Sequence, residues 1–312
     1  MPARKLALLE KKPALNILMT LGRYEFLTAD QVTTFLCAPT SRTMAIAFLT
    51  ELTNAGYTTM LKLNDPSQPF GFTKGVWTLT KKGCDFVESL GVDAVTLPSQ
   101  GPYGPSFLPH ALAVASTGMT FERLAASHPR LDVLELRTER YLKRFAPRME
   151  ITYSAGREHL QTKQATYTPD ALAHFTVDGA RRVAAFEIDR GTEDPAKFRR
   201  KTAEILAWTG GPYKQTYGDS PMGVAVIVAP GPPRTSAPAR RLELLMQWMR
   251  LELSALGKQN WGRIFYFRTA DPAAYTRIDD DNPALSPEEL FLTPRWLRLT
   301  DAAAQPLIGG LA

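Results

Sequence analysis

Three carboxylates near the middle of the sequence, Asp170, Glu187 and Asp189, have the residue types and the spacing of a metal site. Asp178-Gly179 predicts a tight turn between two strands, with Asp170 at the end of one strand and residues 182–189 forming the other. Oxygen-rich clusters suit Mg²⁺ or Mn²⁺, which take one or two protein carboxylates and fill the remaining positions with water and substrate phosphate. The arrangement therefore indicates phosphodiester chemistry on a nucleic acid.

The second strand of this hairpin carries two of the three carboxylates. Alternation places Glu187 and Asp189 on one face, and both follow the apolar run 183–186, which predicts a strand buried on both faces. A charge at the rim of a core is costly unless it is paired or bound to a metal. The alternative interpretation is a solvated strand end.

A basic helix is predicted directly after the hairpin. Asp194 is placed to cap it and Pro195 to occupy its first turn, so that residues 196–208 are helical. Lys197 and Lys201 then share one face at positions i and i+4 and are expected to approach the carboxylates. The alternative is a solvated helix face.

The order Pro169-Asp170, hairpin, Glu187-Ile188-Asp189 and helix resembles the PD-(D/E)xK nuclease core. The third motif of that family is Asp or Glu, any residue, then Lys, and Asp189 stands here in the position of the lysine. The resemblance implies that Asp170, Glu187 and Asp189 are metal ligands and catalytic residues. It also implies that Lys197, Lys201 or Arg190 takes the role of the lysine. An acidic residue on an early helix is usual in this core, and Glu139 is the nearest candidate. The alternative, which we favour, is a surface glutamate paired with Arg140 or Lys143.

A second resemblance explains more of the chain. The run Phe186-Glu-Ile-Asp-Arg-Gly-Thr-Glu193, with Thr168-Pro-Asp170 before it and a basic helix after it, is similar to the replication-relaxation family of plasmids and other mobile elements. The similarity covers roughly residues 14–215. It implies a role in replication, DNA relaxation or DNA transfer, with replication or relaxosome proteins as partners.

The N-terminal residues predict a winged helix-turn-helix. Thr28 and Gln31 have the spacing of a capping box that opens a helix through Leu36. A second helix, capped by Ser41, ends at Gly56 and is expected to turn Met44, Phe48, Leu49 and Leu52 inward. Residues 57–63 and 76–80 then predict a two-stranded wing, and a closing helix follows through residue 90.

Duplex DNA is the expected partner of this domain. Early exposed residues of a recognition helix face the major groove, where Arg42 is suited to a bidentate contact with guanine. The alternative is protein contact or homodimerisation. The candidate DNA-binding residues are Ser41, Arg42 and Thr43 on the helix, and Lys62, Lys74, Lys81 and Lys82 in and after the wing.

Whole-chain properties agree with a nucleic-acid partner. The 312 residues include 37 Lys plus Arg against 31 Asp plus Glu, which gives a net charge of +6 and favours polyanions. Two cysteines, Cys37 and Cys84, provide neither a disulfide framework nor a zinc set. No apolar stretch predicts a signal peptide or a membrane span, so the expected location is the cytoplasm.

A Pro- and Gly-rich stretch at 97–105 predicts the boundary between two domains. The expected fold class is α+β or α/β, with a winged helix-turn-helix at residues 1–98 and a restriction-endonuclease-like mixed-sheet domain at 99–312. In the second domain we expect helices at 108–127 and 239–256, and strands at 131–136, 222–229, 261–269 and 291–299. A basic cluster, Arg137, Arg140, Lys143, Arg144 and Arg148, follows the first of these strands and lines a DNA path or forms a solvated face.

Two functional interpretations follow from the sequence. The first is a DNA-binding protein of a mobile element with a Mg²⁺- or Mn²⁺-dependent nuclease or nickase site. The second is a non-catalytic replication or relaxosome accessory factor, or a transcriptional repressor, that keeps a degenerate nuclease fold, and Asp189 in place of the lysine favours it. A protein-interaction scaffold is a third alternative.

Overall fold

The computed structural model describes residues 12–36, 42–64, 73–92, 103–104, 106–154, 159–232, 235–277, 284–301, 304–309 and 311, without the side chains at 64, 73 and 74. Contacts divide the chain into two compact units. Unit 1 comprises Met1–Arg123 together with Pro272–Ser286, and unit 2 comprises Leu124–Asp271 together with Pro287–Ala312. The domain boundary expected near residue 98 falls among residues that the structure does not describe.

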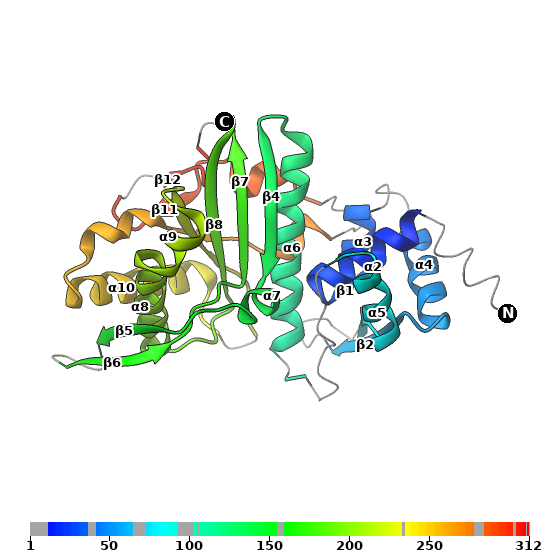
Figure 1. Ribbon diagram of the computed structural model, residues 1–312, viewed down its shortest axis with the longest axis horizontal. Helices are drawn as coiled ribbons and strands as arrows, with labels where there is room; N and C mark the ends of the chain where they lie inside the picture. Colours follow the sequence, from blue (N-terminus) through cyan, green and yellow to red (C-terminus); the bar gives the residue numbers. More distant parts are fainter. Residues whose placement is uncertain are drawn as a thin grey trace. The chain divides into compact units, whose positions relative to one another are not determined.

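Unit 1 consists of helices around a three-stranded sheet (Figure 1). The strands have the order β1-β3-β2, and β3 pairs in antiparallel fashion with both neighbours. The helix α6 (Phe107–Ser127) begins in this unit and ends in the other. The other elements are α2 (Lys12–Tyr24), β1 (Leu27–Thr28), α3 (Ala29–Leu36), α4 (Arg42–Asn54), β2 (Thr58–Asn64), β3 (Thr73–Leu79), α5 (Lys81–Ser89) and a 3₁₀ turn, η2 (Pro272–Tyr275).

Local residue patterns account for the ends of these helices. The predicted capping box is confirmed, because Thr28 N donates to Gln31 Oε1 at 2.8 Å and Gln31 N donates to Thr28 Oγ1 at 3.2 Å. Gly56 has a φ of 78°, the left-handed conformation expected after α4. The expectation for Met44 was wrong, since this side chain is exposed on α4 while Leu49 and Leu52 are buried.

Unit 2 is built on a seven-stranded mixed sheet with the order β12-β11-β10-β9-β8-β7-β4. The pairs β8–β9 and β9–β10 are parallel, whereas β4–β7 and β7–β8 are antiparallel. The strands are β4 (Leu131–Thr138), β7 (Ala171–Val177), β8 (Ala180–Asp189), β9 (Met222–Val228), β10 (Phe265–Thr269), β11 (Trp296–Arg298) and β12 (Ala304–Gln305). The expected mixed α and β fold class is therefore confirmed.

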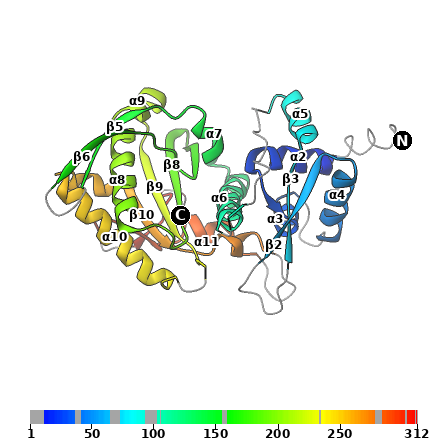
Figure 2. The same ribbon diagram turned by 90° about the horizontal axis from the view of Figure 1, so that it is seen from below.

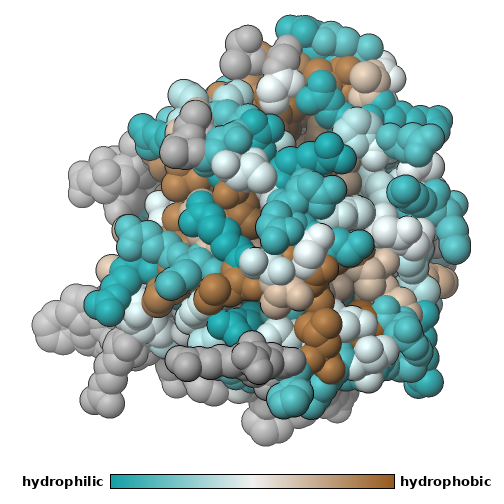
Figure 3. All heavy atoms as spheres, turned by 90° about the vertical axis from the view of Figure 1, so that its left-hand side faces the viewer, coloured by the Kyte–Doolittle hydropathy of each residue, from teal (hydrophilic) through white to brown (hydrophobic). Residues whose placement is uncertain are grey.

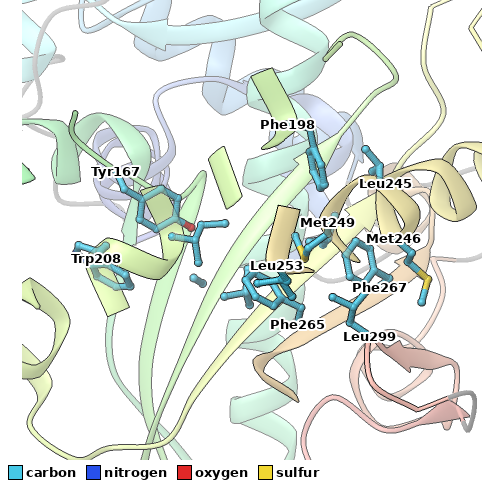
Figure 4. Packing of buried hydrophobic residues seen from close by; sticks show 14 of the residues in the cluster. Tyr167, Phe198, Trp208, Leu245, Met246, Met249, Leu253, Phe265, Phe267 and Leu299 are labelled. Carbon is cyan, nitrogen blue, oxygen red and sulfur yellow. The ribbon is translucent and has the colours of Figure 1, made fainter. Parts of the chain in front are cut away.

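Two long helices, α8 (Pro195–Gly210) and α10 (Pro238–Ala255), lie side by side against one face of this sheet (Figures 1 and 2). In Figure 4, Met249 and Leu253 of α10 meet Phe265 and Phe267 of β10, while Tyr167 lies beside Trp208 of α8. On the opposite face, the ring of Phe186 contacts that of Phe291 at 6.0 Å between centroids, which places α11 (Pro287–Phe291) there. The middle of β8 is consequently covered on both faces, as its apolar run predicts.

The hairpin β7–β8 turns at Asp178 and Gly179, as predicted. Both residues have positive φ, 50° and 77°, and Val177 pairs with Ala180 across the two-residue loop. Asp-Gly suits this geometry because glycine has no Cβ to clash and aspartate tolerates the left-handed region better than most residues. The turn fixes the register, so that Ala171 lies opposite Phe186 and the residues before β7 lie next to the end of β8.

Two predicted strands differ from the structure. The predicted strand at 261–269 is a 3₁₀ helix, η1 (Gln259–Ile264), followed by β10, and the one at 291–299 is the end of α11 followed by β11. The remaining short elements of unit 2 are α7 (Glu139–Lys143), β5 (Met149–Ser154), β6 (Leu160–Ala165) and α9 (Pro212–Tyr217). The ribbon β5–β6 is a separate two-stranded sheet that the sequence did not predict.

The side that bears α10 and the β5–β6 ribbon carries hydrophobic residues scattered among hydrophilic ones (Figure 3). Among the described residues, no helix combines the length and the apolar composition that crossing a bilayer requires.

Candidate functional site

A buried carboxylate and a lysine form the centre of the candidate site. Glu187, near the end of β8, is 4% exposed, and Lys201 reaches it from the second turn of α8. Lys201 Nζ donates to Glu187 Oε2 at 2.8 Å and also lies 2.8 Å from Glu193 Oε1. The other oxygen of Glu187, Oε1, accepts a hydrogen bond of 2.6 Å from the hydroxyl of Tyr167. Both oxygens of Glu187 are therefore bound by donors from different segments.

Asp170 lies beside this pair because of the hairpin register. It follows Pro169 and directly precedes β7, and its Oδ2 accepts a hydrogen bond of 2.7 Å from the backbone N–H of Ile188. Asp170 is 8% exposed, so a backbone donor partly compensates its burial. The hairpin and α8 thus bring Asp170, Glu187 and Lys201 to the same end of β8.

Burial and neighbouring charges set the protonation of this group. Burial raises the pKa of Glu187 to about 7, with the Lys201 charge acting against the rise and the Asp170 charge adding to it. Burial lowers the pKa of Lys201, but the charges of Glu187, Asp170 and Glu193 outweigh it, so the pKa ends well above its usual value. Burial and the charge of Glu187 raise the pKa of Tyr167 well above 10, which keeps the phenol a hydrogen-bond donor.

Asp189 has a different partner from the other two carboxylates. Arg241 of α10 grips it in a bidentate pair, with Nε to Oδ2 and Nη2 to Oδ1 both at 2.8 Å. Gly191 N donates to Asp189 Oδ2 at 3.0 Å, and Arg241 also donates to the carbonyl of Glu193 at 2.8 Å. The guanidinium lies 4.9 Å from the centroid of the Trp248 ring. Asp189 thus holds the loop after β8 to α10.

The other candidates for the lysine role lie elsewhere. Lys197 is one turn before Lys201, has a side chain that is 64% exposed, and lies 3.9 Å from the carboxylate of Asp194. Asp194 caps α8 as predicted, since its side chain accepts a hydrogen bond from Lys197 N at 2.8 Å. Arg190 Nε donates to the carbonyl of Pro230. Lys201 is consequently the candidate that the fold brings to the carboxylates.

The donor chemistry of Asp170 and Glu187 fits one hard divalent cation, because Mg²⁺ is commonly bound through one or two protein carboxylates. Glu187 would exchange its bonds to Tyr167 or Lys201 for the ion. Within the described ranges, no three or more His, Cys, Asp or Glu side chains group so that they would hold a metal ion. The assignment of Asp170, Glu187 and Asp189 as metal ligands stays a prediction.

Glu139, the acidic residue expected on an early helix, forms a surface ion pair. It opens α7, and its carboxylate lies 2.7 Å from Lys143 Nζ one turn later. Its backbone N–H donates to the carbonyl of Asp170 at 2.8 Å. The helix, rather than the Glu139 side chain, is thereby attached to the candidate site.

The predicted DNA-binding residues of unit 1 are largely engaged in local contacts. Arg42 Nε donates to Asp30 Oδ1 at 2.8 Å, and Lys81 Nζ to Asp85 Oδ1 at 2.7 Å. Lys82 Nζ donates to the carbonyl of Ala55 at 2.8 Å. Thr43 and Lys62 are exposed, whereas Ser41 and the side chain of Lys74 lie outside the described residues.

Three residues of the site were missed by sequence reasoning. Tyr167 stands just before the Pro-Asp motif, and its proximity to that motif was the one available indication. Glu193 belongs to the motif that carried the family resemblance, but nothing in it indicated contact with Lys201. Arg241 lies about fifty residues beyond Asp189 and has no sequence pattern that connects the two.

Together, the fold and the site define a mixed α and β protein with a buried acid and lysine centre at the end of a central strand. The chain belongs to the replication-relaxation family, whose model matches residues 18–221. The matched region contains Asp170, Glu187, Asp189 and Lys201, and it ends before Arg241. No curated protein and no solved structure matches the chain.

Proposed function

We propose that this protein acts on DNA in the replication, relaxation or transfer of a mobile element, and that Asp170, Glu187 and Lys201 form a metal-dependent phosphodiester-cleaving site. The observation that carries the proposal is the 2.8 Å contact between Lys201 and Glu187, next to Asp170. The nuclease motif has a lysine where this chain has Asp189, and the contact offers Lys201 of the following helix as its substitute. Family membership supports a role in DNA processing.

Each residue of the proposed site would have a distinct role in cleavage. Asp170 and Glu187 would hold Mg²⁺ or Mn²⁺, which supplies a polarised phosphate oxygen and a water of lowered pKa when bound. Lys201 carries a positive charge that would offset the charge developing on the phosphate. Tyr167 orients Glu187 by donating to Oε1. Glu187 must lose its proton to bind a cation, so cation binding should strengthen as the pH rises through about 7.

Cleavage assays test this proposal. Supercoiled, linear duplex and single-stranded DNA are incubated with Mg²⁺ or Mn²⁺, with a chelator as control. We expect cleavage by the wild type, loss of cleavage in Asp170→Asn and Glu187→Gln, and a decrease of about 100-fold or more in Lys201→Met. Lys197→Met is the matched control on the same helix and should retain activity, because Lys197 is exposed and lies beside Asp194.

The second candidate function is a non-catalytic accessory factor or repressor that uses the same fold for binding. The pairing of Asp189 with Arg241 favours it, because the motif position of the lysine then serves to anchor a loop. Wild-type protein that binds DNA but leaves every substrate intact, with unchanged binding by Glu187→Gln, would support this function and contradict the first.

For unit 1 we infer a winged helix-turn-helix that binds duplex DNA. The support is the order α3, α4, β2, β3, in which two helices precede an antiparallel strand pair. Arg42→Ala should weaken duplex binding if α4 reads DNA, whereas Arg240→Ala, an exposed arginine on α10, should not. Equal affinities for Arg42→Ala and wild type would contradict this role of α4.

A further inference from the structure

The segment after β4 combines exposed aromatic and basic side chains. Phe145 is 70% exposed, more than any other large hydrophobic side chain that the structure describes. Residues 137–148 contain five basic side chains, Arg137, Arg140, Lys143, Arg144 and Arg148, against one acidic side chain, Glu139. Lone exposed hydrophobic residues are ordinary on protein surfaces, but an exposed aromatic ring in a segment rich in basic residues has the composition of a surface that binds nucleic-acid phosphates and bases.

The aromatic side chains of this segment form a short column. The guanidinium of Arg137 lies 4.1 Å from the ring centroid of Tyr141, and the Tyr141 ring lies 5.4 Å from that of Phe145. Tyr141 and Phe145 are four residues apart and share one side of the α7 turn, while Leu142 packs against the core of unit 2. The partly buried Leu142 anchors the turn, and the exposed Phe145 ring ends the column.

Backbone contacts attach this column to the candidate site. Thr138 pairs with Ala171 at the end of the β4–β7 ladder, and Glu139 N donates to the carbonyl of Asp170 at 2.8 Å. The helix α7, which contains Tyr141 and is followed by Phe145, therefore begins at a residue that is hydrogen-bonded to Asp170. A nucleic acid held by this helix would pass close to Asp170.

We propose that residues 137–148, with Phe145 as the stacking residue, bind single-stranded DNA. Bases of a duplex are already stacked on one another, so an exposed ring gains a partner only from an unpaired base. The exposed cations Lys143, Arg144 and Arg148 would lie along the phosphates. The inference deepens the proposed function and rests on it for DNA as the substrate, since an unpaired strand is what relaxation and transfer of DNA expose.

Binding of fluorescent oligonucleotides tests this inference with the full-length chain. Anisotropy is measured for a thymidine oligomer and for a duplex of equal length, in a chelator so that no cleavage occurs. We expect Phe145→Ala to bind the single strand about tenfold more weakly and to bind the duplex as wild type does. Phe145→Tyr should retain binding, whereas Phe145→Leu should behave as Phe145→Ala because it is apolar but has no ring.

Matched controls separate stacking from general surface effects. Leu251→Ala removes another exposed apolar side chain, 48% exposed on α10, and should leave both affinities unchanged. Arg148→Ala should weaken single-strand and duplex binding alike and lower the salt dependence of both. Unfolding transitions of all variants should coincide with that of the wild type, because Phe145 and Leu251 make little buried surface.

Several outcomes would overturn the inference. Unchanged single-strand affinity in Phe145→Ala would do so, as would an equal loss for single strand and duplex, no DNA binding at low salt, or tighter binding of a uridine oligomer than of the thymidine oligomer. Failure of the cleavage proposal can be distinguished from failure of this binding inference. If Phe145-dependent binding occurs without cleavage in Mg²⁺, the cleavage proposal is contradicted and this inference stands. Cleavage of single-stranded DNA that is unchanged in Phe145→Ala, at DNA concentrations at which binding limits the rate, contradicts this inference alone.

Discussion

At the scale of single residues, Glu187 is bound by two donors of different acidity. Tyr167 supplies a phenol to one oxygen and Lys201 an ammonium to the other. Burial favours the protonated acid, whereas the ammonium favours the carboxylate, and these opposing effects bring the Glu187 pKa to about 7. The carboxyl group therefore changes its charge in the range in which a cell keeps its pH.

The first prediction concerns the pH dependence of stability. The folded pKa of Glu187 lies above its ordinary value of 4.5, so the folded protein binds more protons than the unfolded chain between about pH 4.5 and 7. Stability from this group is present at the acidic end and is lost as the pH rises through 7. The free energy of unfolding of wild type, relative to Glu187→Gln, should fall by about 2 kcal/mol from pH 5 to pH 8.

Urea denaturation of the two proteins in a chelator measures this difference. In the wild type, the pKa values of Lys201 and Tyr167 lie well above this pH range, so residue 187 is expected to dominate the difference. Parallel stability curves for wild type and Glu187→Gln across this range would contradict the assignment.

Sequence reasoning identified the acidic residues of the site better than their partners. Asp170 and Glu187 were predictable because they stand in a motif with a fixed order of turn, strand and helix, whereas Lys197, Lys201 and Arg190 all remained candidates for the lysine. Partners such as Tyr167 and Arg241 follow from the packing of the folded chain. Nothing in the spacing of Asp189 distinguishes a metal ligand from an arginine-bound carboxylate, so the sequence left both open.

At the scale of elements, β8 ends between two helices, and each helix provides one basic side chain. Glu187 receives Lys201 from α8, and Asp189 receives Arg241 from α10. The two acids are two residues apart and both face the helices, as strand alternation requires. In the Lys201–Glu187 pair, the lysine side chain is 28% exposed. In the Arg241–Asp189 pair, both side chains are under 10% exposed.

The second prediction compares two bidentate pairs of arginine and aspartate in unit 2. Arg241 and Asp189 are buried, so Arg241→Met leaves an uncompensated carboxylate in the core and should lower the free energy of unfolding by on the order of 3–5 kcal/mol. Arg130 contacts Asp178 through Nε at 2.7 Å and Nη2 at 2.6 Å, but both side chains are more than half exposed.

Arg130→Met is the matched control, and its effect should be much smaller because solvent screens the exposed pair. Equilibrium denaturation at pH 7 gives both values. A loss in Arg241→Met no larger than that in Arg130→Met would show that the buried pair does not anchor the loop after β8.

Elements determined by a few adjacent residues were predictable from the sequence, whereas elements that depend on tertiary packing were not. Asp178-Gly179 fixed the β7–β8 turn, and the Asp194-Pro195 start fixed α8, because each depends on a few adjacent residues. The β5–β6 ribbon lacks an alternating apolar pattern along β6, whose side chains are mostly exposed, so periodicity did not reveal it. Trp261 and Ile264 suggested a strand, but tertiary packing placed them in a 3₁₀ turn.

At the scale of the whole molecule, unit 1 is discontinuous in sequence. Residues 272–286 belong to it, although residues 124–271 lie between them and the rest of the unit. Thr276 carries much of this connection: its hydroxyl lies 2.8 Å from Ser116 Oγ, and its carbonyl accepts a bond from Thr34. Arg123 donates to the carbonyl of Tyr275 at 2.8 Å. The Pro- and Gly-rich stretch at 97–105 gives no indication that residues 272–286 belong to unit 1, because local composition carries no information about contacts between segments distant in sequence.

The third prediction follows from this connection. Thr276→Val removes a buried hydroxyl that contacts Ser116 and should destabilise unit 1 by about 1 kcal/mol. Hydrogen exchange should then speed up for amides of α3, since Gln31 of that helix bonds to Ser116. Thr50→Val, which removes an exposed hydroxyl in α4, is the control and should leave exchange in α3 unchanged. Protection that is identical in Thr276→Val and wild type would contradict the connection.

The discontinuity of unit 1 also has a consequence for the order of synthesis. A ribosome releases the N-terminal helices first, yet the segment at 272–286 emerges only after the intervening 124–271 have been made. At about 5–20 residues per second, this delay amounts to roughly seven to thirty seconds. During that interval the nascent N-terminal part has neither Thr276 nor Tyr275, and it must wait for them in a partly completed state. Slow translation between these segments would lengthen the wait and with it the exposure of unit 1 to misfolding.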